Sequence, residues 1–362
     1  MSHVVHIPHH LRGKTVGEAP FIICETMKKQ KFVIGIDISM DDFHVCANVK
    51  MSTGTVKIKG TRKFPNSEEG FKEFYAWAIK RVSDEDELSF IMEATGVYYE
   101  NLACFLYSHE EYVSVVLANK IKNFAKSLNI KTKTDKVDSK IIAELGLERK
   151  LEKWEPLSAY YKELRDLCRE LLSLKKDISK AKSQLHAMNH SYEKSSRVVK
   201  LKKEQIDFYK NVIVAIKKEL ELLVSNDEEL KEKLKKVQTI PGVGFETALV
   251  LASETNGFRL FKNIRQIVSY AGLDIAFRES GNFRGKTKIT KKGNSRIRHA
   301  LYMPSLSAIQ DNEPIKRLHE RICERNPEIR QKGVVAGMRK LLILVFVLWK
   351  KDEEYDKNYK WG

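Results

Sequence analysis

The feature of this 362-residue chain that most restricts its fold is an apolar stretch, residues 31–39, that contains a single carboxylate, Asp37. A short run rich in Val, Ile and Phe is typical of a strand that is buried on both faces. An ionised carboxylate in such a strand costs free energy unless a partner compensates its charge. A divalent metal ion at the edge of the sheet would be such a partner, so Asp37 is a candidate metal ligand.

Three further carboxylates follow that could join Asp37. Glu93 lies in a second apolar run, residues 88–94, and Asp135 and Asp138 lie three apart in a predicted helix over 135–149. Residues three apart share one helical face, so this pair can point together at the strand ends. Carboxylates brought together repel one another unless cations neutralise them, which favours a site for Mg²⁺ (or Mn²⁺) and phosphoryl transfer. Each carboxylate alone could equally cap a helix or lie on the surface.

The order of predicted elements in residues 31–156 supports this interpretation. We predict, in order, strands at 31–39, 43–49 and 55–64, a helix after Ser67, a strand at 88–94, a helix at 97–109, a strand at 113–119 and a helix at 135–149. A three-stranded antiparallel meander followed by alternating helices and strands is the order of an α/β RNase H-like domain. An actin-like sugar kinase is the weaker alternative, because Ile-Ser-Met-Asp follows the first strand here, not a Gly/Thr phosphate loop.

Residues 157–237 carry apolar side chains at alternating three- and four-residue spacing. Two such segments, joined by the polar and basic stretch 189–205, are typical of an antiparallel helical hairpin or coiled coil. The second segment is continuous only if Asp227 occupies one apolar position. Heptads this regular favour a homo-oligomer, a dimer or tetramer, although the seam could also close within one chain.

The charge of the chain points to a polyanionic partner. It contains 65 Lys and Arg against 48 Asp and Glu, a formal net charge of +17, which favours nucleic acid. A membrane surface is the alternative, but the most apolar C-terminal run, 341–349, is too short to span a bilayer. Residues 1–30, assigned to a tail, show no signal-peptide pattern, and the five cysteines form no CxxC pair. We therefore expect a cytoplasmic, nucleoid-associated protein.

Residues 238–350 are predicted to form a mainly α-helical domain that binds nucleic acid, followed by a tail at 351–362. Ile240-Pro-Gly-Val-Gly244 before an apolar helix resembles a helix-hairpin-helix element, in which Gly242 and Gly244 let backbone N–H groups approach a phosphate. An ordinary tight turn is the alternative. Between residues 255 and 300, eleven Lys and Arg stand against two acidic residues. The candidate phosphate contacts there are Arg278, Arg284, Lys286, Lys288, Lys291, Lys292, Asn294, Arg296 and Arg298.

Ser280 lies in the middle of these cations. A serine hydroxyl among phosphate-binding groups is well placed to attack a phosphodiester, although most loop serines only cap helices or form turns. Ser280 is therefore a candidate nucleophile.

Several segments, in this order along nearly the whole chain, resemble the insertion-sequence-110 family of transposases, which includes relatives of Piv-type DNA invertases. They are Gly35-Ile-Asp-Ile-Ser39, Glu93-Ala-Thr-Gly-Val-Tyr98, Lys133-Thr-Asp-Lys-Val-Asp138, Ile240-Pro-Gly-Val-Gly244, Ser280-Gly281 and Lys292-Gly-Asn294. The resemblance implies that Asp37, Glu93, Asp135 and Asp138 form a RuvC-like DEDD site and that Ser280 is the nucleophile. Many relatives have two adjacent serines before the glycine, whereas Glu279 precedes Ser280 here.

The resemblance also implies an activity: a Mg²⁺-dependent recombinase that acts on donor and target DNA and is guided by a bridge RNA. The sequence itself shows nothing of that RNA beyond basic charge. Two other functions stay open, a RuvC-like nuclease that activates water and a nucleic-acid-binding protein without catalytic activity.

Overall fold

The computed structural model describes residues 30–358, apart from residues 52, 84, 85, 133, 278, 282 and 286. The predicted tail up to residue 29 and the candidate contacts Arg278 and Lys286 therefore lie outside the described residues, and only the backbone of Arg284 is described. The chain divides into two compact units, Met1–Pro156 and Leu157–Gly362.

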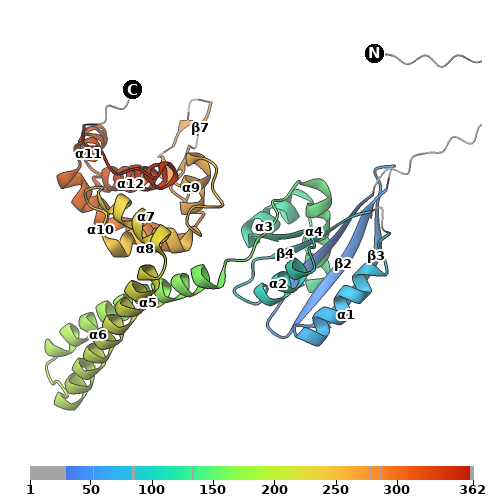
Figure 1. Ribbon diagram of the computed structural model, residues 1–362, viewed down its shortest axis with the longest axis horizontal. Helices are drawn as coiled ribbons and strands as arrows, with labels where there is room; N and C mark the ends of the chain where they lie inside the picture. The colour runs from blue at the N-terminus through green and yellow to red at the C-terminus, as the bar shows by residue number, and fades with distance from the viewer. Residues whose placement is uncertain are drawn as a thin grey trace, which may run out of the picture. The chain divides into compact units, whose positions relative to one another are not determined.

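The N-terminal unit is built around one five-stranded sheet (Figure 1). Its elements are β1 (Lys31–Ile38), β2 (Asp42–Lys50), β3 (Val56–Pro65), α1 (Glu68–Ile79), β4 (Glu87–Glu93), α2 (Glu100–Ser108), β5 (Val113–Val116), α3 (Ala118–Ser127) and α4 (Asp135–Glu148). The strands lie in the order β3-β2-β1-β4-β5, with the first three antiparallel and β1, β4 and β5 parallel. Parallel neighbours need crossover connections, and α1 and α2 supply them.

Helices cover both faces of this sheet. Phe32, Ile34 and Ile36 of β1 pack in one core with α1 and α2. Val33 points to the opposite face and packs with α3 and α4. Gly35 lies on that second face, where a Cβ atom would approach the main-chain oxygen of Ser139 in α4 to 2.2 Å. Glycine at this position therefore lets α4 lie directly on β1.

The predicted division into an α/β N-terminal part and a mainly helical C-terminal part is confirmed. The helix predicted from residue 97 begins only at Glu100. The strand predicted at 113–119 ends at Val116, because the chain turns into α3, which we did not predict. Only Ile121 and Phe124 of α3 are buried, so its apolar pattern is weak.

The C-terminal unit is helical apart from a short β-arm. Its elements are α5 (Ala159–Asn189), α6 (Ser196–Ser225), α7 (Glu228–Gln238), α8 (Phe245–Glu254), α9 (Ile264–Ala271), β6 (Ile275–Ala276), β7 (Glu279–Ser280), β8 (Phe283–Arg284), β9 (Lys288–Ile289), α10 (Ser295–Asp311), α11 (Glu313–Arg325) and α12 (Gln331–Lys351). One apolar core extends from Tyr161 in α5 to Trp349 in α12.

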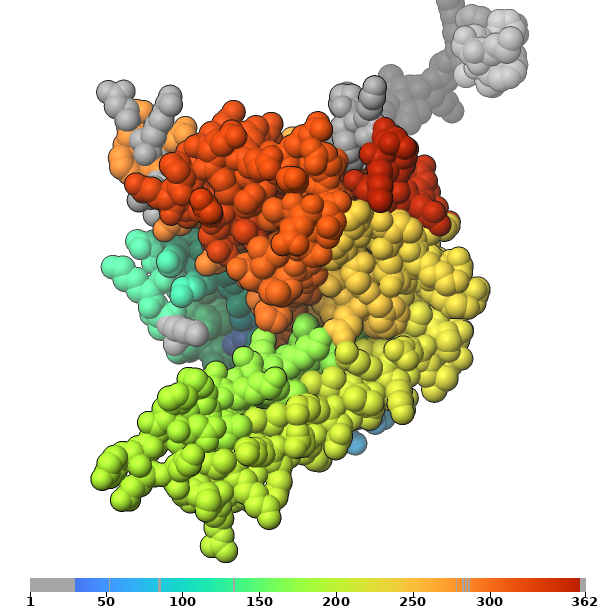
Figure 2. All heavy atoms as spheres, turned by 90° about the vertical axis from the view of Figure 1, so that its left-hand side faces the viewer, coloured from blue at the N-terminus to red at the C-terminus, as the bar shows by residue number. Residues whose placement is uncertain are grey.

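Helices α5 and α6 form the predicted hairpin, and its far end projects from the rest of this unit (Figure 2). Its near end shares the core of the C-terminal helices, so residues 157–237 belong to the same unit as the residues after them. The second heptad segment is not one helix. It breaks at Asp227, whose carboxylate accepts a hydrogen bond from the Leu230 N–H at 2.9 Å and caps α7.

The residues after α12 are attached to the unit. Asp352 forms an ion pair with Lys236 at 2.7 Å, and the Tyr355 N–H donates to the Thr239 hydroxyl oxygen at 2.8 Å. Among the described helices, including the apolar α12, none is long and apolar enough to cross a membrane.

Candidate active site

Asp37 and Glu93 lie next to each other at the carboxyl ends of β1 and β4. The residues just before them are partners in the parallel register of the two strands. Side chains alternate along a strand, so Asp37 shares the face of Gly35 and Glu93 shares the face of Ile91. Both of those residues contact α4, so both carboxylates belong to the α4 side of the sheet.

Asp135 and Asp138 occupy the first turn of α4, which begins where Thr134 accepts a hydrogen bond from the Val137 N–H at 3.3 Å. Two acidic residues in a first turn also suit the positive end of the helix dipole. Ser139, near the start of α4, contacts Gly35 of β1. Gly146, near the end of α4, contacts Val33, which lies two residues earlier in β1. The helix thus runs back along β1, and its first turn lies toward Asp37.

His44 is a neighbour of this group that we did not predict. It is the β2 partner of Asp37 in the antiparallel register, and its Nδ1 lies 3.6 Å from Oδ2 of Asp135. The side chain of His44 is 24% exposed and that of Asp135 is 69% exposed, so the pair sits at the rim of the sheet. The strand pattern at 43–49 was recognisable, but the register that brings His44 to Asp37 was not.

The four carboxylates suit a hard divalent cation, because Mg²⁺ prefers oxygen ligands. The backbone brings them to one edge of the sheet and to one face of it. Among the described residues, the side chains of His, Cys, Asp and Glu form no group of three or more that is close enough to hold one metal ion. Closure of the side chains around a metal ion therefore stays a prediction.

A shallow pocket with cationic walls adjoins His44. It is lined by His44, Val45, Thr61, Arg62, Lys63, Lys136 and Ser139. Lys63 is oriented by an ion pair with Asp42 at 2.7 Å, and Lys136 comes from the first turn of α4 between the two aspartates. Three cationic side chains, of Arg62, Lys63 and Lys136, thus line a pocket next to the acidic edge.

Ser280 lies at the tip of the β-arm. β6 pairs with β9 and β7 pairs with β8, so residues 275–289 fold back on themselves. Ser280 and Phe283 form the last pair of β7 and β8, and Gly281, which follows Ser280, has φ +54, a value that favours glycine. Ser280 is exposed, and among the described residues none hydrogen-bonds to its hydroxyl group. The acidic residue nearest to Ser280 in the chain is Glu279, which directly precedes it on β7.

Asn294 and Arg298, predicted as nucleic-acid contacts, have roles in the fold. The Asn294 side-chain oxygen caps α10 by accepting from the Arg296 and Ile297 N–H groups at 2.9 and 3.3 Å. Arg298 donates to the main-chain oxygens of Ala271 and Gly293 at 2.8 and 3.1 Å. Among the predicted contacts whose side chains are described, Lys288, Lys291, Lys292 and Arg296 are exposed cations. Binding of nucleic acid by any of these residues stays a prediction.

The turn between α7 and α8 holds Gly242 and Gly244, whose contact with a phosphate stays a prediction. Gly242 has φ +94, and a Cβ atom there would lie 2.7 Å from the main-chain oxygen of Pro304, so close packing explains this glycine. Gly244 caps α8 with open space around it. Burial raises the pKa of Glu246 in the first turn of α8, but ion pairs with Lys175 and Lys217 outweigh it and hold the pKa below its usual value. This carboxylate already occupies the positive end of α8.

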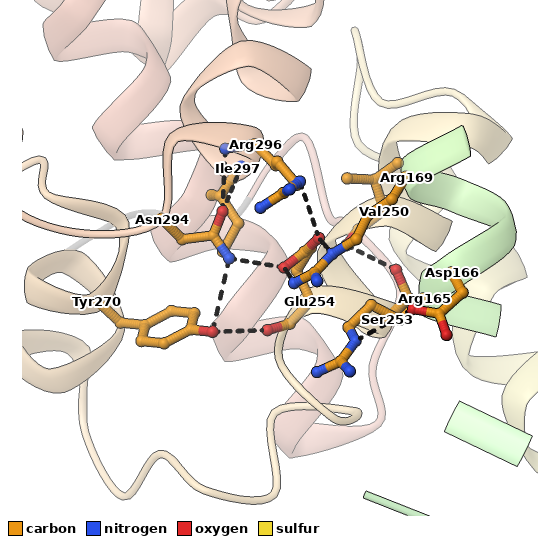
Figure 3. A network of polar contacts seen from close by, with 10 residues as sticks. All are labelled: Arg165, Asp166, Arg169, Val250, Ser253, Glu254, Tyr270, Asn294, Arg296 and Ile297. Atoms are coloured by element: carbon orange, nitrogen blue, oxygen red, sulfur yellow. Dashed lines mark hydrogen bonds and ion pairs between the residues drawn. The ribbon is translucent and has the colours of Figure 1, made fainter. Parts of the chain in front are cut away.

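A buried carboxylate, Glu254, joins the hairpin to the base of the β-arm (Figure 3). Arg169 of α5 donates to it through Nε at 2.7 Å and Nη2 at 2.9 Å. Asn294 Nδ2 donates to the same carboxylate at 2.7 Å, and the Tyr270 hydroxyl donates to the Glu254 main-chain oxygen at 3.1 Å. Burial raises the pKa of Glu254, but the hydrogen bonds from Arg169 and Asn294 outweigh it and lower the pKa overall.

We did not predict a role for Glu254. The signal was present, because a lone acidic residue ends an apolar helix just as Asp37 lies near the end of an apolar strand. Its partners, however, come from positions 85 and 40 residues away, and the sequence pattern does not reveal such pairings.

Two protein-family profiles match the chain. One, of the IS110 DEDD type and described as a transposase, matches residues 34–192. The other, described as "Transposase IS116/IS110/IS902 family", matches residues 234–320. The acidic edge of the sheet and the serine-bearing arm lie in these two ranges, and the protein is thus a transposase. More particularly, the chain belongs to the IS110 family.

Curated relatives agree with this assignment. The pilin gene-inverting proteins of Moraxella bovis and Moraxella lacunata are each 28% identical to the chain over 329 residues, which is 91% of this chain and 98% of the relative. The protein is therefore an enzyme of the DNA transposase and recombinase class. This assignment excludes the alternative of a nucleic-acid-binding protein without catalytic activity.

Proposed function

We propose that the protein cuts and rejoins DNA by transferring a phosphodiester to Ser280, assisted by Asp37, Glu93, Asp135 and Asp138. One observation carries this proposal: an exposed serine ends a cationic arm, while four carboxylates share one face at one edge of the sheet in the other unit.

The reaction balances without an external energy source. The Ser280 oxygen attacks phosphorus, its bond to phosphorus forms, and the bond from phosphorus to a deoxyribose oxygen breaks. The serine proton passes to a base, and the leaving oxygen takes up a proton. A hydroxyl of another DNA end then attacks the phosphoserine, which restores the serine and a phosphodiester. Because one phosphoester replaces another in each step, cutting and rejoining are nearly isoenergetic.

The acidic residues have a distinct task in this scheme. Asp37, Glu93, Asp135 and Asp138 would hold Mg²⁺ or Mn²⁺, which supplies stabilisation of the negative charge that develops on the phosphoryl oxygens. The cationic pocket beside His44 would orient the DNA strand toward this edge. The strand order, with three antiparallel strands and then two parallel ones, supports an RNase H-like, RuvC-like domain for this purpose.

The complete site would be assembled between protomers. A serine hydroxyl without a base or a metal is a poor nucleophile, and the sequence around Ser280 offers only Glu279 and cations. The hairpin supports assembly, because α6 carries a second apolar stripe on its outer side. Its exposed members are Val198, Leu201, Phe208 and Leu222. We propose a dimer or tetramer, in which Ser280 of one protomer meets the carboxylates of another.

The partners proposed are donor DNA, target DNA and, from the family resemblance, a bridge RNA that directs the choice of site. The net charge of +17 supports two or more nucleic-acid strands as partners. Recombination assays with and without transcripts of the flanking non-coding DNA test whether an RNA directs the choice of site. Recombination product that forms equally well without any transcript would contradict the role of the RNA.

Replacing Asp135 by Asn tests the acidic edge. We expect strand cleavage to fall by about three orders of magnitude or more while DNA binding is retained, because the carboxylates serve catalysis and the distributed cations provide affinity. Glu144→Gln is the matched control, since Glu144 lies on the same helix in a surface pair with Lys140. Cleavage by Asp135→Asn at the wild-type rate would remove the acidic edge from the mechanism.

A further inference from the structure

The tip of the β-arm presents a second chemical group beside Ser280. We propose that Phe283 stacks on a DNA base next to the phosphodiester that is cut, so that it holds this base out of the duplex stack. The inference rests on the proposed function in that the cut phosphodiester must come to the tip of the arm.

The geometry of the arm places Phe283 beside the serine. Ser280 and Phe283 are direct partners in the β7–β8 pairing. Directly opposed residues of an antiparallel pair point to the same face with Cβ atoms about 5 Å apart. A nucleotide whose phosphate reaches the Ser280 hydroxyl therefore has its base within reach of the Phe283 ring.

The fold does not explain why a phenylalanine occupies this position. Phe283 is 64% exposed and is not a member of the core of this unit. The strands at the tip are two residues long, and an isolated two-stranded hairpin gains little stability in water. A large exposed ring on such an arm stabilises nothing in the described chain, which points to a ligand.

The surroundings of the ring favour a nucleic-acid base over an apolar partner. The exposed side chains of Lys288, Lys291 and Lys292 follow on the returning strand and the loop after it. Cations and an exposed aromatic ring on one arm are the combination that binds unpaired strands, because the cations attract phosphates and any base can stack on the ring. Aromatic and apolar wedges likewise unstack base steps in bent DNA, which exposes the phosphodiester to attack.

Three substitutions at position 283 test the stacking. On a fully paired substrate, Phe283→Ala and Phe283→Leu should slow cleavage by roughly five- to a hundredfold, the range expected for one lost base–aromatic stack. Phe283→Trp should retain at least most of the activity, because indole also stacks. Phe277→Ala is the matched control, since Phe277 lies on the same arm, is 67% exposed and is not paired with Ser280.

The same variants should behave differently on a prepared substrate. When the nucleotides flanking the mapped cleavage point are mismatched, the base is already unstacked, and Phe283→Ala should recover most of the lost rate. If Leu restores the wild-type rate as well as Trp does, only bulk is needed and the stacking is wrong. A loss in Phe283→Ala that is equal on paired and mismatched DNA would also overturn it.

Photo-crosslinking separates this inference from the identity of the nucleophile. Ser280→Ala protein is mixed with DNA that carries 5-iodouracil on either side of the cleavage point. A crosslink at residue 283 that is lost in Ser280→Ala/Phe283→Ala and kept in Ser280→Ala/Phe277→Ala supports stacking, even if wild-type protein forms no covalent adduct. Absence of this crosslink from DNA that is bound would overturn the inference.

Discussion

Single carboxylates in apolar segments decide much of this structure. Asp37 at the edge of the sheet and Glu254 at the end of α8 both follow apolar residues, but their surroundings differ. Glu254 is 5% exposed and holds three elements together through Arg169 and Asn294. Asp37 instead lies beside Glu93 at the ends of two parallel strands, on the side of the sheet that α4 covers. The same sequence signal thus belongs to a structural group in the case of Glu254 and to the proposed metal site in the case of Asp37.

The Glu254 pair should make stability depend on pH. The folded-state pKa of Glu254 lies below the reference value of 4.5, so its stabilisation is complete above 4.5 and is lost as the pH falls through the folded value. We expect Glu254→Gln to lower the free energy of unfolding by about 2–4 kcal/mol at pH 7, because Arg169 loses its partner. The difference from wild type, measured by denaturant titration, should shrink in acid.

Glu313→Gln provides the control. A hydrogen bond from Arg317 also lowers the pKa of Glu313, but this ion pair lies on the exposed surface of one helix. It should change stability little at any pH. A Glu254→Gln protein as stable as wild type at pH 7 would show that the buried pair contributes nothing net.

At the scale of elements, α6 carries one buried and one exposed apolar stripe. Leu220 is 2% exposed and belongs to the core shared with α5, whereas Leu222, two residues later, is 57% exposed. Heptad spacing predicted the hairpin because both helices follow the 3.5-residue period. It could not predict which stripe closes within the chain.

These two leucines allow a matched test. Leu220→Asp should prevent folding or lower the melting temperature strongly, because the charge has no partner in the core. Leu222→Asp should melt like wild type but sediment as a smaller species, because it disrupts the outer seam between protomers. If Leu222→Asp sediments like the wild type, the outer stripe is not the oligomer interface.

Helices and strands with long, regular apolar patterns could be predicted from the sequence. Elements that depend on pairing with distant segments of the chain could not. The strands around Asp37 and the helix at Asp135 were recognisable because burial and capping are local. Helix α3 was missed since only Ile121 and Phe124 of it are buried, and the β-arm was missed because two-residue strands leave no periodicity. Among site residues, the pairing of His44 with Asp37 and of Phe283 with Ser280 depends on register.

At the scale of the whole molecule, we propose that the net charge of +17 provides most of the affinity for DNA. We predict that its effect is concentrated on the arm and the loop after it. Replacing Lys288, Lys291 and Lys292 together by Gln should reduce the slope of log K against log salt by about 2–3 units, since each phosphate contact contributes about 0.9. Binding titrations at several salt concentrations measure the slope.

The control variant replaces three exposed lysines of the hairpin, at positions 176, 180 and 182, and so removes the same charge elsewhere. Its slope should stay close to that of wild type. Equal slopes in the two variants would place the DNA-binding surface outside the arm.

The central claim, that Ser280 of one protomer works with the carboxylates of another, is tested most directly by mixing two inactive proteins. Wild-type protein should form a covalent adduct with a nicked suicide substrate on denaturing gels. Ser280→Ala and Asp135→Asn should each form none, while Thr287→Ala on the same arm should form it normally. A mixture of Ser280→Ala with Asp135→Asn should restore adduct, carried by the Asp135→Asn chain. An adduct in wild type that the mixture fails to restore would contradict assembly between protomers, and cleavage without any adduct would contradict the serine nucleophile itself.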